Sequence, residues 1–137
     1  MIVRLATPED MPAVFALRHE VFVLGQGVPA DLELDELDEV SDHAVALLDG
    51  VVVGTGRLLP SATIGRMAVS EHLRGRRVGA AVLECLEERA RARGFAVVEL
   101  HAQVHAAGFY DKAGYTPYGE VYLEAGIEHL SMRKELG

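Results

Sequence analysis

The sequence predicts a mixed α/β (α+β) fold with a mainly antiparallel central sheet flanked by helices. Runs rich in β-forming residues alternate with stretches of helical periodicity. The runs His43–Asp49 and Val51–Pro60 enclose an Asp49-Gly50 turn, which is typical of an antiparallel hairpin. Half of the 137 residues are apolar, enough to bury one core without a disulfide or a metal. We therefore expect residues 1–137 to form a single domain.

The N-terminal part predicts a strand, a helix and an acidic connection. Ile2–Ala6 is a short β-rich run. The sequence Thr7–Asp10 supplies an N-cap, a proline at the first helical position and two acids in the first turn. The apolar positions between Met11 and Phe22 then fit a helix with one buried face. Gly25–Asp42 combines Gly, Pro and seven acidic residues, so we expect an irregular connection with one helical turn.

The rest of the chain predicts four further strands and two helices. Apolar residues at four-residue spacing indicate a helix that opens near Arg76 and ends at Arg93, with Gly94 as its C-terminal cap. A shorter helix is closed by Gly114. The predicted ranges, in chain order, are strand Thr63–Val69, helix Arg76–Arg93, strand Phe95–Ala102, helix His105–Ala113, and strands Tyr115–Tyr122 and Gly126–Lys134.

Charge and composition exclude several classes of function. The net charge of −8 argues against binding to nucleic acid, which depends on a basic surface. An acidic surface instead raises the local concentration of cationic small molecules. The single Cys85 excludes an internal disulfide. The N-terminus has acids where a signal peptide is apolar, and no apolar run reaches the roughly 20 residues needed to span a bilayer, so we expect a cytoplasmic protein without a membrane partner.

The turn between the third strand and the long helix is the strongest functional signal. Helix N-termini expose unpaired N–H groups and the positive end of the dipole, and therefore bind anions. Gly75 and Gly79 let the backbone approach a ligand, and Arg74, Arg76 and Arg77 supply donors suited to phosphate. Taken alone, the turn is equally compatible with a solvated, arginine-rich surface loop.

Three motifs together resemble the GCN5-related N-acetyltransferase (GNAT) family. The stretch Arg74–Ala80 resembles the family signature Gln/Arg-x-x-Gly-x-Gly/Ala, with Arg74 and Gly79 matching and Arg77 in place of the first Gly. Gln103–Tyr115 resembles Asn-x-x-Ala-x-x-x-Tyr followed by Lys-x-Gly-Phe/Tyr, with Gln103 in place of Asn. The pieces RHEVFVLGQGVP and EAGIEHLSM, together with the acidic run, resemble the ElaA-like branch. The family's order of elements also matches the predicted order along nearly the whole chain.

The resemblance implies an acetyl-CoA-dependent N-acetyltransferase, an acyltransferase that moves an acetyl group to an amine of a small molecule or peptide by direct attack in a ternary complex. Acetyl-CoA is the expected co-substrate and no metal is expected, since His101 and His105 lack further ligands at metal-site spacing. The implied cofactor-binding residues are Met67, Ala68, Val69, Arg74, Gly75, Arg76, Arg77, Val78, Gly79, Ala80, Gln103 and Tyr110.

The resemblance also implies that Tyr110 is the general acid that protonates the departing sulfur. Candidates for the general base are His43 and His129. Glu33 and Asp35 belong to an acidic run that is either a solvated face or an attractant for a cationic acceptor. Two other functions stay open: a non-catalytic acyl-CoA-binding sensor or interaction module, and a phosphate-binding protein of unrelated fold. Pairing of the C-terminal strands makes a homodimer conceivable.

Overall fold

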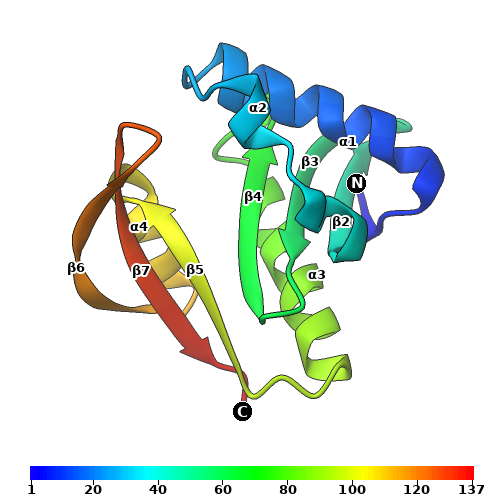
Figure 1. The fold of residues 1–137 in the computed structure, drawn as a ribbon. Coiled ribbons are helices and arrows are strands. Elements are labelled where there is room, and N and C mark those ends of the chain that lie inside the picture. The colour runs from blue at the N-terminus through cyan, green and yellow to red at the C-terminus, as the bar shows by residue number, and fades with distance from the viewer.

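The computed structural model describes residues 1–137, and its central feature is a seven-stranded sheet in the order β1-β2-β3-β4-β5-β7-β6 (Figure 1). Every neighbouring pair is antiparallel except β4 and β5, which confirms the predicted mixed but mainly antiparallel sheet. The strands are β1 (Ile2–Leu5), β2 (Asp42–Leu48), β3 (Val51–Leu58), β4 (Thr63–Val69), β5 (Val97–Gln103), β6 (Thr116–Glu124) and β7 (Ile127–Glu135).

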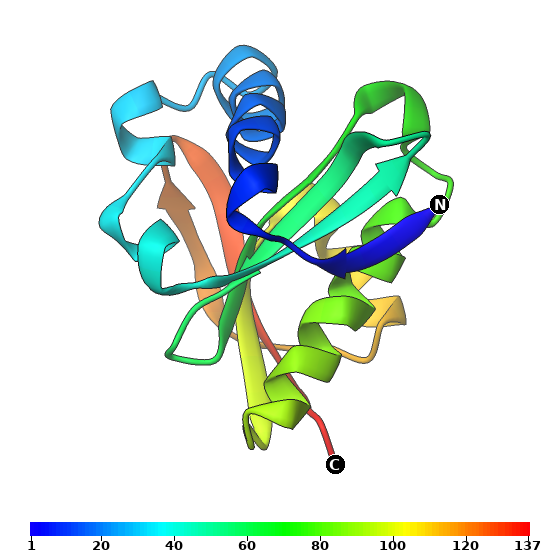
Figure 2. The same cartoon turned by 90° about the vertical axis from the view of Figure 1, so that its right-hand side faces the viewer.

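Helices cover both faces of the sheet. Figure 2 shows α1 (Met11–Arg18) and α2 (Ala30–Glu33) on one side, and α3 (Val78–Ala92) and α4 (Ala107–Lys112) on the other. α1 continues directly into a π-helical segment, His19–Leu24. None of these helices is both long and apolar enough to cross a membrane.

The predicted elements all occur, with shifted ends and one extra turn. The long helix begins at Val78 rather than Arg76, because Arg77 has a left-handed conformation that no α-helix contains. The acidic connection is more regular than predicted, since the 3₁₀ segment Glu36–Val40 follows α2. A capping box at Asp35 explains this segment, because that side chain accepts a hydrogen bond from the Leu37 amide.

The main core lies between α3 and the sheet. Val78, Val82, Leu86 and Ala90 are all buried, as their four-residue spacing predicts. Burying a Val or Leu side chain stabilises a fold by about 1.5–3 kcal/mol. A smaller cluster of Leu17, Val21 and Ala68 holds α1 and the π-helical segment against β4. The two clusters together pack helices against both faces of the sheet.

The sheet opens between β4 and β5. These parallel strands pair only at Thr63–Glu99 and Ile64–Leu100, and they then diverge (Figure 1). From Gly65 onward the edge of β4 that faces β5 has no partner strand. β4 also has an irregular register against β3, where Arg66 takes a left-handed φ of 51°. Bulges and left-handed residues of this kind concentrate next to active sites, so the opening is the first place to look for function.

Candidate active site

A cavity of about 650 Å³ occupies the opening between β4 and β5. Residues from the N-terminal part of the chain, up to β4, and from the C-terminal part, from β5 onward, form its wall. The lining includes Ile64–Met67 from β4, Leu100–Gln103 from β5, Tyr110 from α4, Ile127 and His129 from β7, and Phe22, Gln26, Val28 and Leu32 from the segment that begins at the end of α1. The volume lies within the range of about 300–1,000 Å³ that small-molecule sites occupy.

Tyr110 presents a protonated hydroxyl to this cavity. Its ring packs edge-on against Phe109 and Tyr115, with centroid distances of 5.0 and 5.9 Å. Tyr115 is held in turn by a 2.7 Å hydrogen bond to the buried Glu87. Burial raises the pKa of Tyr110 to about 12, so the hydroxyl keeps its proton at neutral pH. The side chain is therefore rigid and able to donate a proton into the cavity.

The predicted residues Met67, Ala68 and Val69 lie along the free edge of β4. Met67 lines the cavity, whereas Ala68 and Val69 pair with Thr55 and Gly54 of β3 on the other edge. Since β5 has already diverged, the opposite edge of this stretch faces the opening. Backbone groups at this edge are the ones that a linear ligand can bind by extending the sheet.

Gln103 lies at the end of β5, beside the opening between β4 and β5. Its Nε2 donates a 2.7 Å hydrogen bond to Oε1 of Gln26, which lies between the π-helical segment and α2. Its Oε1 accepts a 2.6 Å bond from His105 Nε2. The end of β5 is thus connected to the chain that follows α1, and the predicted cofactor residue Gln103 forms part of the cavity wall.

The predicted anion-binding turn lies on the surface, outside this cavity. Arg74–Arg77 are exposed, and the Arg74 Nε donates to the Val69 carbonyl at 3.3 Å, which ties the turn to the end of β4. The Ala81 amide donates to the Arg77 carbonyl at 3.1 Å. The amides of Val78, Gly79 and Ala80 precede it and have no helical partner. The first three amides of α3 are therefore left without a backbone partner inside the helix.

Two conformations explain the sequence of this turn. Gly75 has a φ of +80° and Arg77 a φ of +64°, both in the left-handed region that glycine favours. Arg77 thus adopts a backbone conformation that glycine favours. A Cβ at Gly79 would lie about 3.5 Å from the Phe109 ring, an ordinary van der Waals contact, so the packing of α3 against α4 does not itself require glycine here.

Arginines pair with three carboxylates of the acidic connection: Glu33, Asp35 and Asp38. Arg18 is 1% exposed, and its guanidinium contacts Glu33 at 2.5 Å and Asp38 at 2.7 Å. Arg57 contacts Asp35 at 2.8 Å and Asp38 at 2.9 Å. Glu33 and Asp35, predicted as possible acceptor-binding residues, do line the cavity, but each is already paired with arginine.

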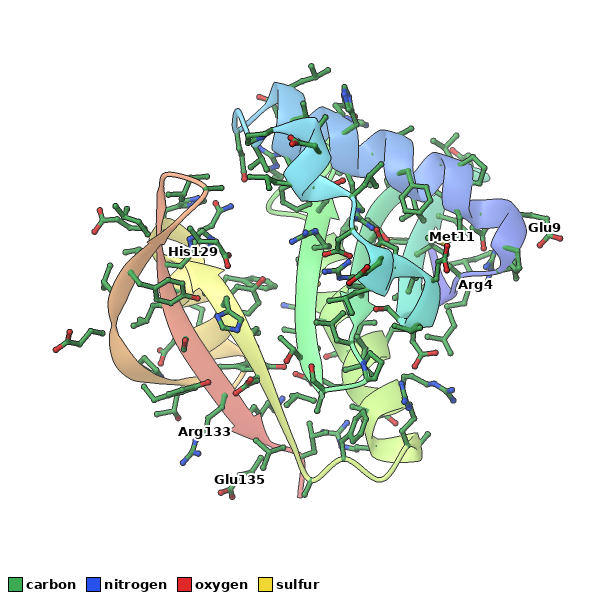
Figure 3. All side chains as sticks on the ribbon, viewed as in Figure 1. Arg4, Glu9, Met11, His129, Arg133 and Glu135 are labelled. Carbon is green, nitrogen blue, oxygen red and sulfur yellow. The ribbon has the colours of Figure 1, made fainter.

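The two candidate bases lie in different places. His43 lies outside the main cavity, and its Nε2 donates to the Asp38 carbonyl at 2.9 Å. His129 lines the cavity, next to the β6–β7 turn (Figure 3). The structure brings His129 together with Met67, Gln103 and Tyr110, and it leaves His43 apart from them.

Several cavity residues were missed by sequence reasoning. Arg57, Arg66, Gln26 and Glu124 all line the cavity but were not among the predicted site residues. Arg57 and Arg66 are recognisable only once the register of β3 and β4 is known. Gln26 lies in the piece RHEVFVLGQGVP and Glu124 is the first residue of EAGIEHLSM, so the family resemblance is the sequence signal that pointed toward these two.

Comparison with known proteins shows the family to which the chain is similar. The family model described as "Acetyltransferase (GNAT) domain" matches residues 8–136. The uncharacterized N-acetyltransferase YjcF of Bacillus subtilis is 38% identical over 131 residues, covering 93% of this chain and 94% of that protein. Protein ElaA of Escherichia coli is 36% identical over 132 residues, covering 90% and 86%.

Solved structures show the same fold. The crystal structure of an acyl-CoA N-acyltransferase from Pseudomonas aeruginosa superposes with a TM-score of 0.86 at 32% identity, covering 98% of this chain and 99% of that one. The crystal structure of Escherichia coli ElaA also gives a TM-score of 0.86, at 31% identity over 98% and 100% of the two chains. The chain therefore belongs to the GNAT family of acetyltransferases.

Proposed function

We propose that residues 1–137 act as one N-acetyltransferase domain that binds acetyl-CoA and transfers its acetyl group directly to a primary amine of a small molecule or peptide. The observation that carries this proposal is the opening between β4 and β5, which holds a cavity with the Tyr110 hydroxyl in its wall. A thioester in this opening would have an unpaired strand edge on one side and a proton donor on the other.

The cofactor would bind along a line from the turn to the cavity. The free amides of Val78, Gly79 and Ala80, with the arginines of the turn, would hold the pyrophosphate at the start of α3. The pantetheine arm would then pair with the free edge of β4 at Met67–Val69. Tyr110 and Gln103 would lie next to the thioester end, since both line the cavity.

Acetyl transfer in this site would proceed through a tetrahedral intermediate. The amine nitrogen attacks the acetyl carbon, and a backbone N–H of β4 stabilises the developing oxyanion. The carbon–sulfur bond then breaks and Tyr110 gives its proton to the sulfur. Burial disfavours a free thiolate as well as a free phenolate, so proton transfer accompanies departure of the sulfur.

The first experiment tests cofactor binding by thermal melting. Acetyl-CoA at 100 times its dissociation constant should add about 2.7 kcal/mol to the free energy of unfolding. Release of free thiol in the presence of amines then tests catalysis. A melting shift without thiol release from any amine would favour the alternative of a non-catalytic acyl-CoA-binding module.

Tyr110→Phe tests the general acid. The variant should lower kcat by about 100-fold, the lower end of what a positioned acid contributes, and leave the dissociation constant of acetyl-CoA unchanged. Tyr118→Phe is the matched control, because Tyr118 lies on β6 outside the cavity wall and bonds to Glu99. An unchanged rate for Tyr110→Phe would remove this residue from the mechanism.

A further inference from the structure

The geometry points to an acceptor site on the β6–β7 hairpin, where the ammonium group of a primary alkylamine docks on Glu124 and gives a proton to Nε2 of His129. This inference rests on the acetyl transfer proposed above. It deepens that proposal by naming the charge state of the acceptor and the residues that receive it.

Among the carboxylates of the cavity wall, Glu124 is the one that is available to bind an ammonium group. Three carboxylates line the cavity: Glu33, Asp35 and Glu124. Glu33 lies 2.5 Å from Arg18, and Asp35 lies 2.8 Å from Arg57. Glu124 has no arginine or lysine partner, its side chain is 59% exposed at the rim, and its nearest ionisable neighbour is His129 Nε2 at 3.6 Å from Oε2. The uncompensated negative charge of the wall is therefore at the hairpin, not in the acidic connection.

The surroundings of His129 fix which ring nitrogen carries hydrogen. Nδ1 lies 2.7 Å from the carbonyl oxygen of Ile127. A carbonyl only accepts, so Nδ1 must donate, and in the neutral ring Nε2 is then the atom with the free lone pair. The ring also stacks on Tyr122 at a centroid distance of 5.9 Å and an angle of 27°, and Tyr122 bonds to His101. The imidazole is therefore held in one orientation, as a proton acceptor.

The position of His129 suits attack on a thioester in the opening. Its Cα partner across the sheet is Gln103, the last residue of β5 and part of the cavity wall. Opposite residues in an antiparallel pair are about 4.5–5.5 Å apart. His129 thus lies one strand away from the proposed path of the pantetheine arm. Figure 3 shows it near the hairpin turn, close to the start of β7.

The proton transfers balance with these two residues. Glu124 holds the ammonium, His129 takes one proton, and the neutral amine forms the carbon–nitrogen bond. The nitrogen then loses a second proton, which replaces the one that Tyr110 gives to the sulfur. Protonated His129 returns its proton to solvent at the open rim. The sum is ammonium plus acetyl-CoA giving amide, CoA thiol and one proton.

The test compares amines that are charged at neutral pH with amines that are not. Phenethylamine, lysine amide and spermidine serve as ammonium probes; aniline and O-benzylhydroxylamine serve as uncharged probes. With the best ammonium probe, Glu124→Gln should raise KM about fivefold, the factor that an exposed ion pair supplies. His129→Asn keeps an amide N–H for Ile127 but loses Nε2, and it should lower kcat/KM about 100-fold.

The pH profile supplies a readout that a structural role would not move. Wild-type kcat/KM for the ammonium probe should fall on acidification, because a protonated imidazole accepts nothing, and His129→Asn should lose this dependence. The other titratable groups around the ring are Tyr122 and Glu124 on β6, His101 on β5, and His105 next to Gln103. Controls are Glu128→Gln, on the same hairpin, and His19→Asn; both side chains are exposed and lie outside the cavity wall.

The possible outcomes distinguish failure of the acceptor site from failure of the proposed acetyl transfer. Activity with ammonium probes that falls as stated in both variants supports the acceptor site, whether or not uncharged probes react. Wild-type activity that both variants retain, or that falls equally with uncharged probes, overturns the acceptor site and leaves acetyl transfer standing. Silence of the wild type toward every probe, despite binding acetyl-CoA, overturns both. Should His129→Asn fail to melt cooperatively, Glu124→Gln and the wild-type pH profile on the two probe classes decide.

Discussion

At the scale of single residues, the backbone conformation of Arg77 shapes the turn that precedes α3. A non-glycine residue in the left-handed region costs roughly 1–2 kcal/mol, and the φ of Arg77 is +64°. The residue is exposed and forms no ion pair that offsets this cost. The family resemblance shows Arg where the signature has Gly, but it did not show that this Arg takes a left-handed conformation, which glycine favours.

Arg77→Gly should therefore stabilise the protein. Relief of the left-handed strain exceeds the extra entropy of an unfolded glycine, so we expect a gain of about 0.5–1 kcal/mol in the free energy of unfolding. The measurement is the urea midpoint at constant m-value. Arg76→Gly is the matched control, because Arg76 lacks a positive φ and glycine there should lower stability by a similar amount. If Arg77→Gly and Arg76→Gly destabilise the protein equally, the left-handed backbone of Arg77 does not cost stability.

At the scale of elements, the arginine–carboxylate network attaches the segment between α1 and β2 to the sheet. Arg18 comes from α1 and Arg57 from β3, and Asp38 accepts hydrogen bonds from both. Burial alone would raise the pKa of Asp38, but the hydrogen bonds and charge of the two arginines outweigh it and hold the pKa below its usual range. The hydrogen bond from Arg57 also lowers the pKa of Asp35.

The sign of these shifts gives a pH dependence. A carboxyl whose pKa is lower in the folded state contributes stability above its unfolded value, near 3.9, and loses that contribution as the pH falls further. Asp38→Asn should destabilise the protein by about 3 kcal/mol or less at neutral pH, because Arg18 and Arg57 each lose one of their two carboxylate partners, and it should flatten the loss of stability below about pH 5. Denaturant midpoints from pH 3 to 7 measure both effects. Asp31→Asn, at an exposed position, should follow the wild type; a wild-type slope in Asp38→Asn would refute the coupling.

At the scale of the whole molecule, the order of elements was predictable and the active cavity was not. Periodicity and turn residues located the strands, and the buried spacing from Val78 to Ala90 located α3, because these signals are local. The cavity depends on contacts between distant segments, such as the bond between Gln26 and Gln103. The same limit explains the acidic run: charge counting suggested an attractive surface, whereas packing supplies each cavity-facing carboxylate of that run with an arginine.

The sheet therefore consists of two blocks, β1–β4 and β5–β7, whose strands pair at only two positions. A ligand that fills the opening should hold the blocks together, and hydrogen exchange can detect this. We expect saturating acetyl-CoA to slow exchange in residues 65–69 and 100–103, because their backbone lines the opening, and to leave β1 unchanged. Slowing that is uniform over the chain would indicate global stabilisation alone. Unaltered exchange in residues 65–69 at saturation would mean that the arm of the cofactor does not pair with β4, and the assignment of Met67–Val69 would then fall while the site at the start of α3 could still stand.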